Sequence, residues 1–425
     1  MSDEKHIVIL GAGFAGTTLA RALERRLSES YCITLISRDN YITYNPLLAE
    51  VVGSSILSSH VVAPVRQMLK RTRFCMVNVT DIDLEKKQIH YLGEGSGVIE
   101  YDEIVIACGV RANLDLLPGM AKYALPLKTV GDAMFLRNRV IARLEQAELQ
   151  QRMESRLWLT TFIIIGGGFS GVEVTGEIAD FLHAAHRYYK RTNERDFRVL
   201  LLHGGDRLLL ELPAKLSAFT LRKMQAHKID VRLNTRVARV DGRGVVLESG
   251  ERIDAGTVIC TIGTAPHTLV EQLPLTKERG RVLTNPDMSV LDFPGVWALG
   301  DCAAIPNAYD DRLSPPTAQF ATRQAGQLAK NIHRTTQGKK TRAFQFRPLG
   351  QLSSIGHNKA VAVVFGIHFS GFIGWLLWRG VYLLKFPTFA RKVRLFFEWS
   401  WEMLFPQDVV HLSHSRTKRD ITRKS

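Results

Sequence analysis

The sequence has few cysteines and no arrangement of them that carries redox or metal chemistry. None of the five falls in a Cys-x-x-Cys pair or at a Cys/His spacing typical of a metal site. Their neighbours are apolar and strand-like, which predicts buried, reduced thiols in a reducing compartment. We therefore expect neither a redox-active dithiol nor a bound metal at Cys32, Cys75, Cys108, Cys260 and Cys302.

The sequence also lacks a long apolar run. The 19 residues Ala360–Trp378 carry no formal charge, but a single membrane span needs about 20 mostly apolar residues. Glycines interrupt this run, so we expect a strand near 360–367, a turn, and a helix near 372–385. At the other end, a strand that begins by about His6 leaves no room for a signal peptide, and we expect the catalytic body in the cytoplasm.

Acidic residues are too few to balance the basic ones. The 425 residues include 56 Lys and Arg against 41 Asp and Glu, a net charge of +15. Such an excess favours an acidic partner, and we expect anionic lipid or phosphorylated cofactors and no nucleic acid. With 45% apolar residues, the chain is long enough for two or three folded domains.

Two glycine-rich loops are the most informative motif present. Residues 11–16 read GAGFAG and residues 166–171 read GGGFSG, each between a strand-like run and a helical pattern. The first Gly allows a tight turn, the second lets backbone N–H groups approach a pyrophosphate, and the third lets helix and strand pack closely. One such loop is weak support, but the pair predicts two bound dinucleotides.

The order of strands and helices repeats around the two loops. Each loop is followed by a helix, a strand, an antiparallel meander (72–101 and 231–253) and a further buried strand. This predicts an α/β fold with two Rossmann-like domains, and a strand near 296 with a helix at 317–333 should return to the first of them. The expected regions are 1–111 and 271–345 as the first domain, 112–270 as the second, and 346–425 as a C-terminal membrane-anchoring helical segment.

The C-terminal region contains an amphipathic helical pattern with Trp399 and Trp401 on its flanks. We expect a monotopic anchor that lies in the membrane interface. A helix packed on its own body or on a partner subunit, and a spanning helix, are the alternatives. Basic residues at 416–424 would favour anionic lipid. The apolar face comprises Phe389, Val393, Phe396, Phe397, Met403 and Leu404, and the charged face comprises Arg391, Arg394, Glu398 and Glu402.

The sequence resembles the type II NADH:quinone oxidoreductases, single-subunit flavoproteins of the membrane surface, over essentially its whole length. Spread in this way, the shared motifs are far more specific than either glycine loop alone. Besides the loops and the aromatic C-terminus, they are Asn40-Tyr41, Pro46-Leu47-Leu48, Pro64, Arg66, Leu127-Lys128, GVEVTGE at 171–177, ALGDCA at 298–303 and AQFA at 318–321.

This resemblance implies a reaction and its partners. Hydride would pass from NADH to flavin N5 of FAD, and two electrons would then pass to a membrane quinone without proton pumping. The enzyme would lie peripherally on the cytoplasmic side of the cell membrane, in contact with quinone and anionic lipid, and two copies could form a homodimer.

The resemblance also implies site residues. The first loop would hold FAD and the second NADH, with Asp301 accepting a hydrogen bond from the ribityl chain. Glu173 would lie near the nicotinamide and flavin, or else be a carboxylate that meets the helix dipole. Gln319 would contact the quinone, or else be a surface or capping amide. The cofactor-binding set is Gly11, Gly13, Phe14, Ala15, Gly16, Arg38, Asp39, Pro46, Cys108, Gly109, Gly166, Gly168, Phe169, Ser170, Gly171, His203, Gly263, Gly300, Asp301, Ala318 and Gln319.

Three positions differ from the family pattern. Ser37 replaces the acidic residue that commonly ends the second strand of the FAD unit, and Asp39 could serve instead. The matching NADH position, usually Glu, is His203, with Arg207 nearby. Because His does not reject a 2′-phosphate as a carboxylate does, we expect NADPH to be tolerated. Arg323 stands where the family usually has Gln.

Three other functions share parts of this pattern. A sulfide:quinone oxidoreductase would need a cysteine pair at the flavin, and Cys108 and Cys302 both follow strands near cofactor loops. A soluble ferredoxin or rubredoxin reductase would use the positive charge to dock an acidic protein, but leaves the aromatic C-terminus unexplained. A binding module that kept the folds without catalysis would explain His203 and Arg323.

Overall fold

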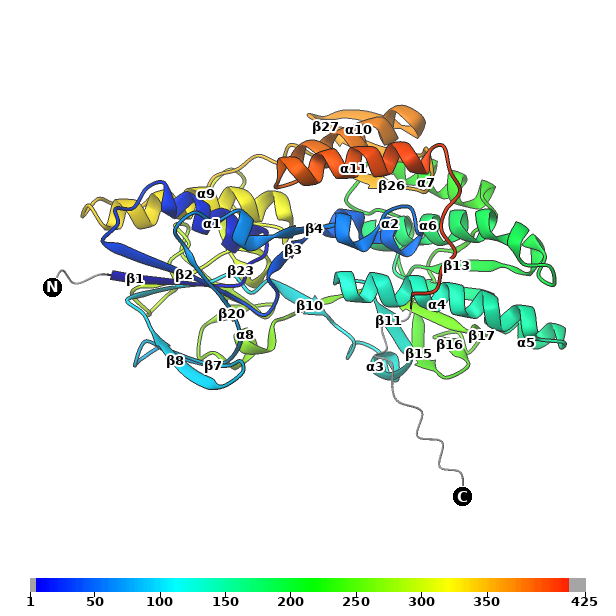
Figure 1. Ribbon diagram of the computed structural model, residues 1–425, viewed down its shortest axis with the longest axis horizontal. Helices are drawn as coiled ribbons and strands as arrows, with labels where there is room; N and C mark the ends of the chain where they lie inside the picture. Colours follow the sequence, from blue (N-terminus) through cyan, green and yellow to red (C-terminus); the bar gives the residue numbers. More distant parts are fainter. Residues whose placement is uncertain (1–4, 413–425) are drawn as a thin grey trace, which may run out of the picture.

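The structure, a computed structural model, describes residues 5–412. It contains two lobes, each built on a five-stranded parallel sheet (Figure 1). The strand order is β22-β9-β1-β2-β5 in the first lobe and β11-β18-β12-β13-β14 in the second. The predicted pair of Rossmann-like folds is therefore confirmed. The first sheet comprises β1 (Lys5–Leu10), β2 (Tyr31–Ser37), β5 (Arg73–Met76), β9 (Glu103–Ile106) and β22 (Val296–Ala298); the second comprises β11 (Ala124–Pro126), β12 (Thr161–Ile165), β13 (Arg198–Leu202), β14 (Asp230–Arg232) and β18 (Thr257–Cys260).

The central strands are buried on both faces, as parallel strands between layers of helices must be. Ile7, Val8 and Ile9 of β1 are fully buried, and β12 is buried along its whole length. β22 pairs with β9, although the whole second lobe lies between them in the sequence. This return brings the residues that follow β22 to the sheet edge where the first glycine loop lies.

Helices begin at both glycine loops. α1 (Phe14–Glu24) follows β1 and α6 (Phe169–Ala185) follows β12, while α9 (Ala318–Thr335) packs along α1 (Figure 1). Leu19 and Leu23 of α1 are fully buried, as their spacing predicts. The other helices before residue 349 are α2 (Leu48–Val52), α3 (Met120–Tyr123), α4 (Val130–Leu149), α5 (Met153–Leu159), α7 (Ala214–Ala226) and α8 (Thr268–Gln272).

Each lobe also carries an antiparallel meander, but both meanders are shorter than predicted. At the start of the second one, residues 230–232 pair with β13 in the parallel sheet as β14. Residues 73–76 belong to the parallel sheet as β5, because pairing with β2 buries Phe74. The meanders are β6 (Asn78–Asp83), β7 (Gln88–Leu92) and β8 (Ser96–Glu100), and β15 (Val237–Asp241), β16 (Gly244–Leu247) and β17 (Arg252–Asp254).

Short strands join the lobes and brace the loops. The two chain segments that pass between the lobes pair as β10 (Val110–Ala112) and β19 (Thr264–Pro266). The others are β3 (Tyr41–Thr43), β4 (Val62–Pro64), β20 (Lys277–Glu278), β21 (Arg281–Leu283), β23 (Ala303–Ala304), β24 (Pro306–Asn307) and β25 (Arg312–Leu313).

The C-terminal region is a three-stranded antiparallel sheet followed by two helices that lie across both lobes (Figure 1). The single strand expected near 360–367 is wrong: the chain turns at Phe365 and Gly366, which both have positive φ, and forms a hairpin. Within residues 5–412, no helix is long and apolar enough to cross a membrane. The elements are β26 (Gly350–Ser354), β27 (Ala360–Val364), β28 (Ile367–Ser370), α10 (Gly371–Lys385) and α11 (Phe389–Glu402).

Helix α11 turns the glutamates of its charged side toward the protein and its apolar side outward, while Arg394 is exposed. Glu402 is buried against Arg379 of α10, and Glu398 accepts a hydrogen bond from the Leu57 backbone N–H. Trp399, expected on a flank, is instead buried because its indole N–H donates to Glu50. The predicted apolar face, Phe389, Val393, Phe396, Phe397, Met403 and Leu404, is exposed. The basic residues at 416–424 lie outside the described residues.

Candidate functional site

The first glycine loop is packed as tightly as a dinucleotide fingerprint requires. Gly11 has a φ of +105°, and a Cβ there would lie 2.4 Å from the carbonyl oxygen of Ala107. A Cβ at Gly16 would lie 1.9 Å from the Gly11 carbonyl oxygen, whereas one at Gly13 would meet nothing within 4 Å. Two glycines thus permit the turn and the helix contact, and the middle one faces open space where a pyrophosphate could approach.

The second loop repeats this geometry. Gly166 has a φ of +118°, and a Cβ at Gly171 would lie 1.7 Å from the Gly166 carbonyl oxygen. Gly168 again faces open space. His203, the residue after β13, lies beside the loop, and its Nδ1 accepts a hydrogen bond of 3.1 Å from the Gly167 backbone N–H.

Both lobes contribute to one cavity of about 510 Å³. The first loop and the residues after β9 and β22 form one wall, and the start of α6 in the second lobe forms another. Residues from distant parts of the sequence therefore meet at the predicted place. The predicted site residues that line this cavity are Gly13, Phe14, Ala15, Asp39, Pro46, Cys108, Gly109, Phe169, Ser170, Glu173, Gly300, Asp301 and Ala318.

The remaining predicted residues lie outside this lining. Arg38 is exposed and pairs with Asp39 at 3.7 Å, whereas Ser37 and Asp39 line the cavity at the end of β2. Gly263, with a φ of +68°, lies between β18 and β19, directly before β19. Gly166 and Gly168 precede α6, Gly171 lies in its first turn, and His203 contacts the same loop.

Three carboxyl groups line the cavity, those of Asp39, Glu173 and Asp301, and burial shifts the pKa of the last two. Burial raises the pKa of Asp301, while Lys128 and Arg281 lower it. Burial raises the pKa of Glu173 to about 8, and its Oε1 accepts a hydrogen bond of 3.3 Å from the Ser354 backbone N–H. The first turn of α6 contains no acidic residue, so Glu173 does not cap the helix. A protonated carboxyl at the cavity can donate a proton there.

A second, more apolar cavity of about 520 Å³ adjoins the first, and Phe14, Pro46 and Phe169 line both. Gln319 lines it, but its amide also accepts from the Leu349 N–H at 2.9 Å and donates to the Gly350 carbonyl oxygen at 3.4 Å. The amide is therefore both a wall residue and a brace for the β26 loop. Arg323 stacks on the Phe346 ring, 5.5 Å from its centroid, in the same wall.

Sequence reasoning missed the part of the wall that comes from the C-terminal region. Leu352 of β26 and Tyr382 of α10 line both cavities, and the Tyr44 hydroxyl donates to the Tyr382 carbonyl oxygen at 3.2 Å. No motif marks these residues, because their place depends on how α10 packs on the first lobe.

A third cavity, of about 880 Å³, is lined by none of the predicted residues. Thr161 and Arg198, which begin β12 and β13, line it. It thus lies at the amino ends of the strands, whereas doubly wound sheets bind their ligands at the carboxyl ends. We therefore place the functional site at the two smaller cavities.

Comparisons with known proteins show the family of the chain. Residues 5–325 match the family model of the pyridine nucleotide-disulphide oxidoreductases, and residues 349–408 match that of the NDH2 C-terminal domain. The chain belongs to the pyridine nucleotide-disulphide oxidoreductase family. Within this family, the C-terminal match and the relatives below confirm the resemblance to type II NADH:quinone oxidoreductases that the sequence motifs indicated.

Three relatives illustrate the similarity. The type II NADH:quinone oxidoreductase Ndh of Mycobacterium tuberculosis is 29% identical over 412 residues, which cover 93% of this chain and 87% of that one. A probable NADH dehydrogenase of Dictyostelium discoideum is 28% identical over 418 residues, covering 96% and 91%. The structure of NDH2 from Plasmodium falciparum in complex with NADH superposes with a TM-score of 0.89 at 21% identity, covering 96% and 100%.

Proposed function

We infer that this chain is an FAD-dependent NADH:quinone oxidoreductase that does not pump protons. One observation carries this inference: the helices of both glycine loops reach one cavity, which shares lining residues with an apolar cavity lined in part by Tyr382 and Lys385 of α10. A reductant on the second loop, a flavin on the first and an apolar acceptor would thus share one wall. FAD supplies the two-electron chemistry there when bound.

The residues at the cavities fit these three molecules. Open space at Gly13 faces the start of α1, whose positive end favours a pyrophosphate. Asp301 offers carboxylate oxygens to sugar-like hydroxyls in the wall. We assign Glu173 as the proton donor at the cavity, and Gln319 as the amide that shapes the quinone wall and contacts the quinone.

The sulfide:quinone alternative has less support. Burial raises the pKa of the Cys108 thiol and raises that of Cys302 to about 11, and both cysteines are free thiols. Sulfide chemistry at a flavin needs reactive thiolates or a disulfide, which these environments disfavour. A soluble ferredoxin reductase would leave the exposed apolar face of α11 without a purpose.

A donor comparison tests the activity. The purified, FAD-loaded protein would be assayed with ubiquinone-1 or menadione and with NADH, NADPH or sulfide. We expect fast quinone reduction by NADH and none by sulfide. Turnover with sulfide, together with none from either nicotinamide, would overturn the assignment.

NADPH also serves as a donor in this proposal. The residue directly after β13 is His203 and not a carboxylate, although Asp206 follows three residues later. Arg207 is held by the backbone carbonyls of Leu210 and Leu212. Arg236 is better placed: its side chain lies across Gly204, and its guanidinium has no ion-pair partner within residues 5–412. A 2′-phosphate beside His203 would meet this guanidinium.

The C-terminal region supports peripheral attachment to a membrane. The outer side of the hairpin, α10 and α11 bears a set of exposed large apolar residues, whereas soluble monomers rarely expose such a contiguous area. We propose that this surface enters the lipid and brings the apolar cavity to the quinone pool. Attachment on the cytoplasmic side, anionic lipid and a homodimer stay predictions. The residues are Phe365, Ile367, Phe372, Ile373, Leu376, Leu384, Phe389, Phe396, Phe397, Trp401, Met403 and Leu404.

Two matched substitutions test this attachment by vesicle flotation. Leu404, on the proposed lipid surface, and Leu149, at the end of α4, are each 78% exposed. Leu404→Glu should weaken binding to vesicles, and Leu149→Glu should not. We expect stronger flotation with anionic than with neutral lipid, and a wild-type protein that binds neither would contradict the proposal.

A further inference from the structure

The third cavity, of about 880 Å³, lies in the second lobe between α4, α5 and the second meander. Its volume falls in the range of about 300–1,000 Å³ that is typical of small-molecule sites. Thr161 at the start of β12 lines it, whereas Gly166 of the nucleotide loop follows the other end of this strand. At a rise of about 3.3 Å per residue, these two positions lie about 16 Å apart. A ligand in this cavity would therefore be separate from the dinucleotide.

The cavity lies on the face of the second sheet that the meander covers. Side chains alternate between the two faces of a strand, and Ile163 and Leu200 belong to one apolar cluster with Val245 of the meander. Thr161 and Arg198 precede Ile163 and Leu200 by two residues, so they lie on the same face, and they line the cavity. The meander thus packs on the later residues of these strands and leaves their first residues as cavity wall.

The fold does not require an arginine at this place. His6 of the first lobe matches Thr161, because each lies five residues before the first glycine of its loop. Their strand partners, Cys32 and Arg198, match as well. In the first lobe, the His6 imidazole reaches the end of the meander, with Nδ1 2.7 Å from the Glu100 carbonyl oxygen. An arginine-lined wall here is thus a feature of the second lobe and not of the fingerprint.

The wall of this cavity is rich in arginine. It contains five arginines against three carboxylates, those of Glu154, Glu251 and Asp254. Glu251 pairs with Arg232 at 2.8 Å. Asp254 pairs with Arg243 at 2.6 Å. The wall therefore keeps an excess of positive charge. The arginines are Arg143 of α4, Arg198 of β13, Arg232 of β14, Arg243 between β15 and β16, and Arg252 of β17.

Two of these arginines, Arg143 and Arg198, have no ion-pair partner among residues 5–412. The Arg143 guanidinium donates to Gln146 Oε1 and to the Gly256 carbonyl oxygen, each at 2.8 Å. Its Nε–H is buried and has no hydrogen-bond partner in the same range of residues. Burial, and after it the charge of Arg139, lowers the pKa of Arg143. An anion in the cavity would offset the cost of burying this charge.

Trp158 of α5 adds a flat apolar surface to the wall. Its ring lies 4.9 Å from the Arg143 guanidinium carbon, and its indole N–H donates to the Arg243 carbonyl oxygen at 3.0 Å. Contacts on two sides thus hold the ring in place, and Leu157 and Ile253 line the cavity beside it. An aromatic ring next to guanidinium groups suits a ligand that combines a flat ring system with phosphates.

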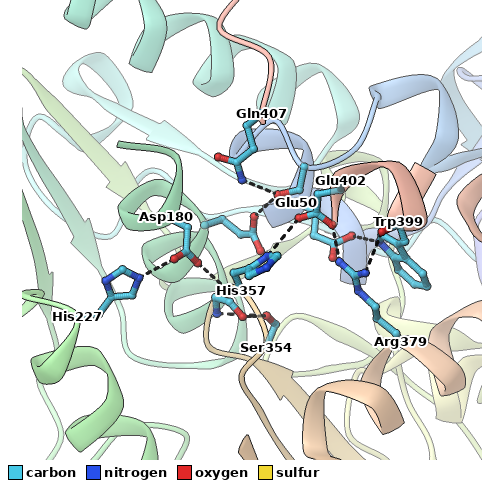
Figure 2. Close-up of polar contacts among 12 residues, drawn as sticks. Glu50, Asp180, His227, Ser354, His357, Arg379, Trp399, Glu402 and Gln407 are labelled. Atoms are coloured by element: carbon cyan, nitrogen blue, oxygen red, sulfur yellow. Dashed lines mark hydrogen bonds and ion pairs between the residues drawn. The ribbon is translucent and has the colours of Figure 1, made fainter. Parts of the chain in front are cut away.

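Arg379 shows how this chain balances a buried guanidinium without a ligand. It also stacks on a tryptophan, with its guanidinium carbon 5.0 Å from the Trp399 ring centroid, but it pairs with the carboxylate of Glu402 as well (Figure 2). Arg143 has the tryptophan and lacks the carboxylate among the described residues. We therefore expect the anion that pairs with Arg143 to come from solution.

The position of the cavity favours a soluble ligand over a lipid headgroup. α5 and the meander strands β16 and β17 lie on the opposite side of the second lobe from α10 and α11 (Figure 1). The exposed apolar residues proposed to enter the lipid lie on the hairpin, α10 and α11. A phosphate bound in the cavity would thus come from the aqueous side.

We propose that this cavity is a further nucleotide site, which binds a soluble nucleoside polyphosphate, such as ATP, while a nicotinamide dinucleotide occupies the second loop. Arg143 and Arg198 bind the phosphates, and Trp158 with its apolar neighbours contacts the base. The ligand is neither donor nor acceptor of electrons, and no bond of it is made or broken. The site therefore goes beyond the proposed function and does not depend on it.

Isothermal titration calorimetry of the FAD-loaded protein tests the site. ATP is titrated in the presence of saturating NAD⁺, so that ATP cannot enter the second loop. We expect one ATP per chain, with an affinity that falls as salt rises, because the contacts are ionic. Tripolyphosphate should bind more weakly than ATP, because it leaves Trp158 without a contact. Equal affinity for the two ligands would overturn the assignment to a nucleoside.

Two matched substitutions locate the binding. Arg198 and Arg222 are both exposed and have no ion-pair partner among residues 5–412, and Arg222, on α7, does not line the cavity. Arg198→Gln and Arg222→Gln each remove one positive charge. The first should weaken ATP binding about tenfold or more, because it removes a charged hydrogen-bond donor to phosphate. The second should leave ATP binding unchanged.

The outcomes separate the site from the proposed activity. ATP binding that NAD⁺ abolishes, or that both substitutions weaken equally, would overturn the site. So would Arg198→Gln that binds ATP as tightly as the wild type. A protein that binds ATP as described but does not reduce quinone would overturn the activity and leave the site. Should Arg198→Gln purify without FAD, Arg143→Gln decides in the same way.

Discussion

The two nucleotide-binding lobes share a loop but not its surroundings. Gly13 and Gly168 have nearly the same backbone angles, with φ −73° and ψ −166° against φ −78° and ψ −172°. Beyond the loops, α1 packs against α9, while α6 packs against α2 and the C-terminal sheet. The comparison teaches that the glycines define where a dinucleotide binds, whereas the neighbours of each helix decide what the site does.

The largest effects should come from adding a methyl group to either loop. Gly16→Ala and Gly171→Ala would each place a Cβ within 2 Å of a backbone carbonyl oxygen, at 1.9 Å and 1.7 Å, a clash that costs more than the about 1–3 kcal/mol of ordinary overpacking. We expect the first variant to purify without FAD, and the second to keep FAD but lose reduction by NADH.

Gly326 provides the control for these two variants. It lies within α9, and a Cβ there meets nothing within 4 Å. Gly326→Ala should keep FAD and raise stability by about 0.5–1 kcal/mol, as Ala does in helices. Flavin absorbance of the purified proteins and thermal unfolding measure both quantities. Equal FAD content in all three variants would contradict the assignment of FAD to the first loop and NADH to the second.

A smaller effect, on the preference for NADH over NADPH, is expected from the residues that follow β2 and β13, because these residues differ between the lobes. Asp39 follows β2 and faces the cavity, whereas His203 follows β13. His203→Glu should raise the preference for NADH over NADPH about tenfold or more, because the carboxylate repels a 2′-phosphate. Arg236→Gln should shift the preference in the same direction. Ratios of kcat/KM measure this, and an unchanged ratio would mean that His203 does not face the ribose.

The smallest effect concerns stability against pH. Burial raises the pKa of Glu50 to about 8, against about 4.3 in an unfolded chain. Between these values the folded state binds the proton more tightly, so stability falls as pH rises, by at most about 1.4 kcal/mol per pH unit. Glu50→Gln keeps an acceptor for Trp399 and should flatten the decline in melting temperature from pH 6 to 8. An unchanged slope would show that Glu50 is ionised.

The sequence predicted the parts of the site that local chemistry determines. The glycine loops and their helices follow from residue type and short-range spacing, whereas the role of Asp301 came from the family resemblance. The parts of the cavity walls that Leu352 and Tyr382 form could not be predicted in this way, because their positions depend on long-range packing. β5 was misplaced because its role depends on pairing with β2. The pattern in α11 gave two faces but not their direction, which is set by Arg379 and Glu50 drawing Glu402 and Trp399 inward.

Anaerobic stopped-flow absorbance of the flavin tests the central claim most directly. In the wild type, NADH should bleach the flavin and ubiquinone-1 should restore it. In Gly171→Ala, NADH should fail to bleach it, but flavin reduced by dithionite should still be restored by ubiquinone-1. Restoration would then not require NADH to bind at the second loop. A wild-type flavin that NADH bleaches and quinone does not restore, or a Gly171→Ala flavin that NADH bleaches at the wild-type rate, would contradict the account.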